Sequence, residues 1–125
     1  MKNLAFGVLS VLVMVIVATP ISAQNRIGPN EAAKYAGKKA TVCGQVTSTN
    51  YAEGSKGRPT YLNLDRAYPN QKFNAIILGE NRDKFSKPPE VDYAGKKICV
   101  TGTVGVAGGV AEIFVRDPSQ ITRGE

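Results

Sequence analysis

The chain has 125 residues, a formal net charge of +6 at pH 7, and neither histidine nor tryptophan. The lack of histidine removes the commonest general base and the commonest zinc ligand. No Gly-rich phosphate loop, serine nucleophile elbow or recognisable metal spacing takes its place. We therefore expect a binding protein rather than an enzyme, with no catalytic residues, metal or cofactor. Its modest basic charge suits nucleic acid, an anionic envelope surface or an acidic partner, or solubility alone.

The first 23 residues have the layout of a signal peptide. Lys2 supplies the positive start, an almost unbroken apolar run extends from Leu4 to Ala18, and small residues precede Gln24. The alternative is an uncleaved anchor, but the run is shorter than the roughly 18 to 20 residues that a spanning helix needs. We predict a signal peptide over 1–23 and a single domain over 24–125. The mature protein would be periplasmic or secreted, with no stable membrane insertion after cleavage.

Two similar stretches organise the mature chain. The first is Gly37–Val46, GKKATVCGQV, and the second is Gly95–Val104, GKKICVTGTV, 58 positions later. Tyr-Ala precedes each stretch, and each contains an alternating apolar pattern with a glycine inside it. The repetition predicts two equivalent β-strands.

The two cysteines occupy these two stretches. Alternation places Cys43 and Cys99 on the face opposite the apolar rows in both segments. An even pair of cysteines in an exported chain is typical of a disulfide, which we predict here if the strands are neighbours. Two free thiols are the alternative. A redox site is disfavoured because the chain has no Cys-x-x-Cys spacing.

The rest of the chain reads as short strands separated by turns. Pro29–Tyr35 is expected to form a short helix, and another helical turn is expected at Asn81–Phe85, ended by Pro88-Pro89. The predicted inner residues of the middle and last strands are Leu62, Leu64, Phe73, Ala75, Ile77, Ala111, Ile113 and Val115. The predicted strands are Lys39–Thr49, Thr60–Asp65, Lys72–Leu78, Lys96–Val106 and Val110–Arg116.

This order predicts an all-β fold, a five-stranded OB-fold Greek-key barrel. It has a short N-terminal helix and a short helical connection between strands 3 and 4. Gly44 and Gly102, inside the first and fourth strands, permit the bending that a small barrel requires. An open five-strand meander also fits the pattern, but it would leave apolar edges exposed.

The run from Ile27 to Ile121 resembles small exported bacterial OB-fold proteins of the tRNA-anticodon/helicase nucleic-acid-binding type. The matching pieces are EAAKYAGKKATVCGQV, TYLNLDRAYPNQKFNAII, YAGKKICVTGTV and EIFVRDPSQI, of which DPSQI is the most distinctive. The resemblance covers nearly all of the predicted mature chain. It implies nucleic-acid binding without a catalytic site.

Single-strand binding by such a barrel uses aromatic platforms for base stacking and a basic groove for the phosphates. Tyr61, on the outer face of the second strand, is the best stacking candidate. Lysines and an arginine near that strand could meet phosphates, and two asparagines could hydrogen-bond to bases or sugars. The candidate binding residues are Tyr61, Asn63, Lys56, Arg58, Lys72 and Asn74.

Two hypotheses remain open at this point. The first is a module for single-stranded DNA or RNA. The second is a protein-interaction or envelope module that uses the same barrel face for a polypeptide or a glycan, with an exported protein as a partner. The first hypothesis requires Lys56, Arg58, Lys72 and Tyr61 on one continuous face, whereas scattered charges would favour the second.

Overall fold

The structure is a computed structural model that describes residues 7, 10–16 and 26–124. The predicted cleavage site and most of the predicted signal peptide lie outside the described residues. Among those that are described, no helix is long and apolar enough to span a bilayer. The strands are β1 (Arg26–Ile27), β2 (Lys39–Tyr51), β3 (Thr60–Leu64), β4 (Phe73–Ile77), β5 (Lys97–Thr103), β6 (Gly105–Ala107), β7 (Val110–Phe114) and β8 (Ile121–Arg123).

The predicted number of five strands is wrong, because the described part of the chain contains eight. Four of the predicted strands correspond to β2, β3, β4 and β7. The predicted fourth strand is divided at Val104 into β5 and β6, since the first part pairs with β2 and the second with β7. The very short β1 and β8 were not predicted, and they add to the free edges of β2 and β5.

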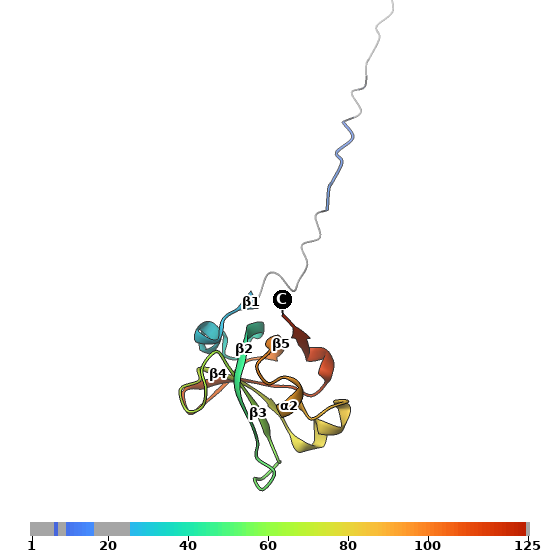
Figure 1. Cartoon of the computed structure of the whole chain (residues 1–125). Coiled ribbons are helices and arrows are strands. Elements are labelled where there is room, and N and C mark those ends of the chain that lie inside the picture. The colour runs from blue at the N-terminus through green and yellow to red at the C-terminus, as the bar shows by residue number, and fades with distance from the viewer. Residues whose placement is uncertain (1–6, 8–9, 17–25, 125) are drawn as a thin grey trace, which may run out of the picture.

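The strands are hydrogen-bonded in the order β6-β7-β4-β3-β2-β5-β8, with β1 pairing separately with β2. The β4–β7 and β1–β2 pairs are parallel and the others are antiparallel. Since β5 and β6 are successive parts of one segment, that segment pairs with β2 at one end and with β7 at the other. The sheet therefore curls around one core. Figure 1 shows the loop between β2 and β3 at the opposite end of the molecule from β1 and the C-terminus.

The inner rows form the core as predicted. Every apolar residue assigned to an inner row is buried, because alternate residues of a strand face the same side. Tyr35 and Phe85 pack against this cluster from its periphery. The fully buried large side chains include Val42, Val46, Leu62, Leu64, Phe73, Ile77, Ile98, Val100, Val104, Ile113 and Val115.

The two similar stretches begin in the same backbone conformation. Gly37 has φ +81° and Gly95 has φ +75°, which favours glycine at both turns. The Gly37 N–H donates to Val104 O, and the Gly95 N–H donates to Val46 O. Each stretch therefore starts against the end of the other.

The centre of this arrangement is the pair Val42–Val100, which occupy equivalent positions in the two stretches. On one side of it the Thr41 and Thr101 hydroxyl oxygens lie 2.8 Å apart and are hydrogen-bonded. On the other side Cys43 and Cys99 form the predicted disulfide. The internal repeat thus pairs with itself in antiparallel register.

The described residues also form three helical segments of 3-10 type and one α-helical turn. They are η1 (Pro29–Tyr35), η2 (Gly79–Lys84), α2 (Pro89–Asp92) and η3 (Pro118–Gln120). The first matches its predicted bounds. The predicted turn Asn81–Phe85 corresponds to η2, which begins and ends earlier; Pro88 and Pro89 do not end it, because it stops at Lys84, and Pro89 instead begins α2. Proline suits the first turn of a helix, where its missing N–H has no partner to lose.

The DPSQI segment has a structural role. The Asp117 side chain accepts a hydrogen bond from the Ser119 N–H, and Gln120 completes a capping box on η3. The Gln120 carboxamide accepts from the Arg116 N–H and donates to Thr101 O of β5. This segment therefore joins the end of β7 to β5, and it allows β8 to follow along the edge of β5.

Gly102 lies where the inner side of β5 approaches β7. A Cβ there would lie 2.6 Å from Ile113 Cγ2, whereas a Cβ at Gly105 would lie 3.6 Å from the nearest atom, Glu112 Cγ. We expect Gly102→Ala to lower the free energy of unfolding by about 2 kcal/mol through overpacking. The matched change Gly105→Ala should alter it by less than about 0.5 kcal/mol. Urea unfolding of both variants measures this, and equal effects would contradict the close approach.

Candidate functional site

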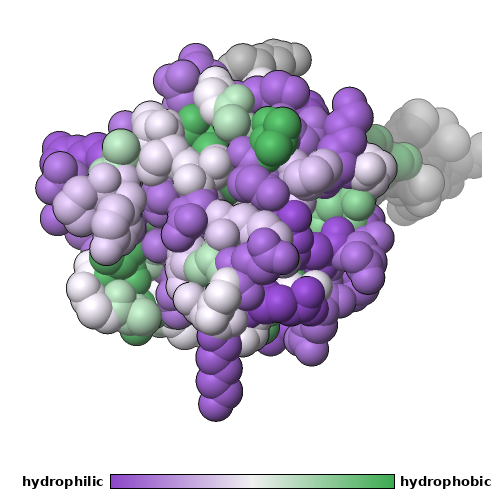
Figure 2. All heavy atoms as spheres, turned by 60° about the horizontal axis from the view of Figure 1, so that its bottom comes forward, coloured by the Kyte–Doolittle hydropathy of each residue, from purple (hydrophilic) through white to green (hydrophobic). Residues whose placement is uncertain are grey.

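The outer face of β3, β4 and β7 carries two rows of side chains that cross the strands. The outer aromatic row contains Asn50, Tyr61, Ile76 and Phe114, which are successive register partners on β2, β3, β4 and β7. The outer polar row contains Ser48, Asn63, Asn74 and Glu112 on the same four strands. Figure 2 shows one face of the molecule, on which hydrophobic residues form small separate patches among hydrophilic ones.

Tyr61 lies on this outer face as predicted, and it is half-buried. Phe114 lies in the same outer aromatic row, beyond Ile76, and it is 39% exposed. Phe114 was missed as a binding candidate. The alternation of VAEIFVR, which points Ala111, Ile113 and Val115 inward, already places it on the outer face.

The predicted cations do not form one cluster. Lys56 and Arg58 lie in the loop before Thr60, at the end of β4 marked by Ile77. Lys72 precedes Phe73 at the other end of β4, beside the start of β7, where its carbonyl accepts from the Ala111 N–H. About five residues of strand, roughly 15 Å, separate the two positions. The cations therefore stand at opposite ends of the outer face.

Arg58 is held close to the start of η2. Its backbone has φ +44°, and its side chain passes so near Gly79 that a Cβ there would lie 2.8 Å from Nε. The Gly79 N–H donates to Gly57 O. These contacts hold the Arg58 side chain and the loop backbone against the start of η2.

Asn63 and Asn74 lie on the outer face, directly opposite each other, but both are buried, with 2% and 7% exposure. The Asn63 amide donates to Ser48 Oγ at 2.9 Å, and the Tyr68 N–H donates to the same oxygen at 3.1 Å. The loop after β3 is thus tied beside the outer polar row. Burial raises the pKa of Glu112, the next residue in that row.

Two tyrosines near this face have different environments. Tyr51, at the end of β2, carries the Arg82 guanidinium 3.6 Å from its ring centre, so one ring face is already occupied. Tyr68 is 73% exposed in the loop between β3 and β4. Neither ring is a register partner of Tyr61.

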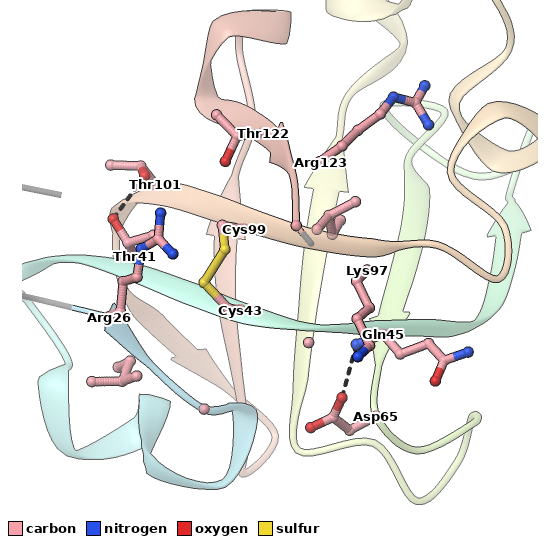
Figure 3. A pocket seen from close by; sticks show the side chains of 15 residues that line it. Arg26, Thr41, Cys43, Gln45, Asp65, Lys97, Cys99, Thr101, Thr122 and Arg123 are labelled. Carbon is pink, nitrogen blue, oxygen red and sulfur yellow. Dashed lines mark hydrogen bonds between the residues drawn. A yellow bond between two sulfur atoms is a disulfide. The ribbon is translucent and has the colours of Figure 1, made fainter. Parts of the chain in front are cut away.

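A hollow with a volume of about 1000 Å³ lies elsewhere, on the outer face of β1, β2, β5 and β8. Figure 3 shows the Cys43–Cys99 disulfide at its centre, with Thr41 and Thr101 to one side and Gln45 and Asp65 to the other. The Asp65 carboxylate accepts from the Gln45 N–H at 2.8 Å. None of the six predicted binding residues lines this hollow.

In the described part of the chain, no group of three or more histidine, cysteine, aspartate or glutamate side chains is placed to hold a metal ion.

Comparisons with known proteins show the fold and no more. No family model and no curated protein matches the chain. Among solved structures it is similar to an OBody bound to hen egg-white lysozyme, with a TM-score of 0.57, 18% identity, and coverage of 80% of this chain and 91% of that one. It is also similar to asparaginyl-tRNA synthetase from Pyrococcus horikoshii, with a TM-score of 0.54, 19% identity and coverage of 80% of this chain.

The chain spans only 23% of that synthetase. A likeness at this level of identity carries neither activity nor substrate. With the eight-stranded sheet and its parallel β4–β7 pair, it shows a β-rich, OB-like fold.

Proposed function

We propose that this protein is an exported OB-fold module that binds single-stranded DNA or RNA without catalysing a reaction. The observation that carries the proposal is the outer aromatic row, in which Tyr61 and the 39%-exposed Phe114 lie on one face of β3, β4 and β7. The strands in the middle of an OB-fold are where oligonucleotides bind. Aromatic rings on such a face stack against bases of any sequence.

The predicted cations are divided between the two ends of this face. Lys56 and Arg58 lie at one end of β4 and Lys72 lies at the other. A nucleic-acid strand that crosses the outer aromatic row would therefore have positive charge near it on both sides of the row. One of the structural neighbours is a tRNA synthetase, an enzyme that acts on a nucleic acid. The predicted signal peptide and the disulfide are consistent with a periplasmic or secreted protein.

Fluorescence anisotropy of a labelled single-stranded oligonucleotide tests the proposal. We expect saturable binding to the oxidised protein that weakens steeply as salt rises, because phosphate contacts release counterions. Tyr61→Ala and Phe114→Ala should each weaken binding about tenfold through lost stacking. The matched control is Val91→Ala, which alters a 71%-exposed apolar residue on α2 and should leave affinity unchanged.

A second candidate is a protein- or glycan-interaction module that uses the same face. It is favoured by the separation of Lys72 from Lys56 and Arg58 and by Glu112, which adds a carboxyl group to the face. The OBody neighbour, described as bound to lysozyme, has a related fold. No oligonucleotide binding even at low salt would sink the nucleic-acid proposal and leave this one, with an exported protein as the partner to be sought.

A further inference from the structure

The outer polar row contains hydrogen-bond acceptors that are buried and unused. Asn63 Oδ1 and Asn74 Oδ1 have no donor among the described residues, and the same holds for Gln71 Oε1 in the loop before β4. The two asparagines are direct register partners on adjacent strands, so their Cβ atoms lie about 5 Å apart on one face. Buried polar atoms are nearly always paired, and a buried acceptor without a donor destabilises the folded protein.

These acceptors adjoin the outer aromatic row. Asn63 is two residues from Tyr61 along β3, and Asn74 is two residues from Ile76 along β4, on the same outer face. A base stacked on Tyr61 would therefore lie beside the two asparagines. The Asn63 amide nitrogen is already committed to Ser48 Oγ, which leaves Asn63 as an acceptor.

Two adjacent acceptors call for two adjacent donors. Guanine is the base whose Watson–Crick edge presents them, as N1–H beside the N2 amino group. Adenine and cytosine each offer a single amino group, and thymine and uracil a single ring N–H between two acceptors. We propose that the outer polar row selects guanine in a single strand bound on this face, with Asn74 and Asn63 accepting from N2 and N1. The inference rests on the proposed nucleic-acid function and names the base that the site prefers.

The loop between β3 and β4 is anchored next to the acceptors. The Tyr68 N–H is hydrogen-bonded to Ser48 Oγ, the same atom that holds the Asn63 amide. The loop is therefore tied at this one side chain beside the acceptors. Since both acceptors are buried, binding of guanine requires the residues that cover them to move.

The test compares oligothymidines that carry one central guanine, inosine, adenine or cytosine, titrated into the full oxidised protein by fluorescence anisotropy. Inosine differs from guanine only by the missing N2 amino group. We expect guanine to bind about tenfold more tightly than inosine and the other bases, since a bidentate base contact discriminates by roughly that factor or more. Asn74→Ala should bring guanine to the level of inosine.

The matched control is Asn30→Ala, which removes an exposed asparagine from η1, away from this face, and should keep the guanine preference. The guanine–inosine comparison uses the unaltered protein, so the proposal can be tested even if a variant does not fold. Equal binding of all four oligonucleotides, or binding of the inosine, adenine or cytosine oligonucleotide at least as tight as that of guanine, would overturn the guanine inference and leave the proposed function intact. Failure to bind any of them at low salt would instead overturn the proposed function.

Discussion

Reduction of the Cys43–Cys99 disulfide lowers the free energy of unfolding by about 4 kcal/mol. The bond joins positions 56 residues apart, and the chain-entropy model gives this value for a loop of that length because the unfolded chain loses much of its freedom. A domain of this size is stable by only about 5 to 15 kcal/mol, so the loss is a large part of the total. Urea unfolding of the oxidised and reduced protein, followed by circular dichroism, measures it.

The folded structure should survive this reduction at low denaturant. β2 and β5 remain paired over seven residues, from Lys39–Thr103 to Gln45–Lys97, and Thr41 and Thr101 keep their hydrogen bond. The control is the double variant Cys43→Ala/Cys99→Ala, which should be as unstable as the reduced protein and insensitive to reductant. A difference below about 1 kcal/mol between oxidised and reduced protein would contradict the prediction.

The two equivalent strands β2 and β5 are the part of the fold that sequence alone predicts best, whereas their pairing is only the condition for the predicted disulfide. The two similar stretches carry both the alternation and the cysteines. Their register is symmetric about the pair Val42–Val100, which occupy equivalent positions in the two stretches. In both copies the same alternate positions face the core, so the pattern of each strand agrees with the way in which the two strands pair.

The short strands could not be predicted in the same way. β1 has two residues and β8 has three, too few for any periodicity. Their conformation depends on the free edges that β2 and β5 offer, a tertiary circumstance that outweighs intrinsic strand preference. Val104 divides the predicted fourth strand for a similar reason, because β5 and β6 have different partners.

The candidate site shows the same limit. Alternation correctly places Tyr61, Asn63 and Phe114 on the outer face, but it says nothing of what covers them. Asn63 is buried beside Ser48, which also holds the backbone of Tyr68 from the next loop. That contact joins three segments, so no local pattern could reveal it.

We expect the second large loss of stability from removal of the Arg82 side chain. Arg82 makes a bidentate contact with the Glu90 carboxylate, at 2.8 and 3.2 Å, and donates to Thr60 Oγ1 at 2.6 Å. Arg82→Ala would leave Glu90 without its partner at a site where the two side chains are only 16% and 20% exposed. We expect a loss of about 3 kcal/mol in the free energy of unfolding, the lower end for breaking a largely buried pair. Thermal and urea unfolding measure it.

The comparison with Arg123→Ala decides whether burial is the cause. Arg123 also lies 2.8 Å from a carboxylate, that of Asp92, and near the ring of Tyr93, but its side chain is 48% exposed. Exposed pairs contribute little, so this variant should lose less than about 1 kcal/mol. Equal losses in the two variants would contradict a role for burial.

The pH dependence of stability tests the same pair independently. The hydrogen bond from Arg82 lowers the pKa of Glu90 below its ordinary value. The ionised carboxylate therefore stabilises the folded state fully above the unfolded pKa of about 4.3, and this contribution is lost as pH falls through the lower folded pKa. In Arg82→Ala the pKa of Glu90 should rise, because the unpartnered carboxylate keeps its desolvation and loses its hydrogen bonds. The stability difference between wild type and variant should then shrink as pH falls below about 4. A difference that stays constant down to pH 2 would show that Arg82 stabilises the fold through its contacts with Tyr51 and Thr60 rather than through the charge of Glu90.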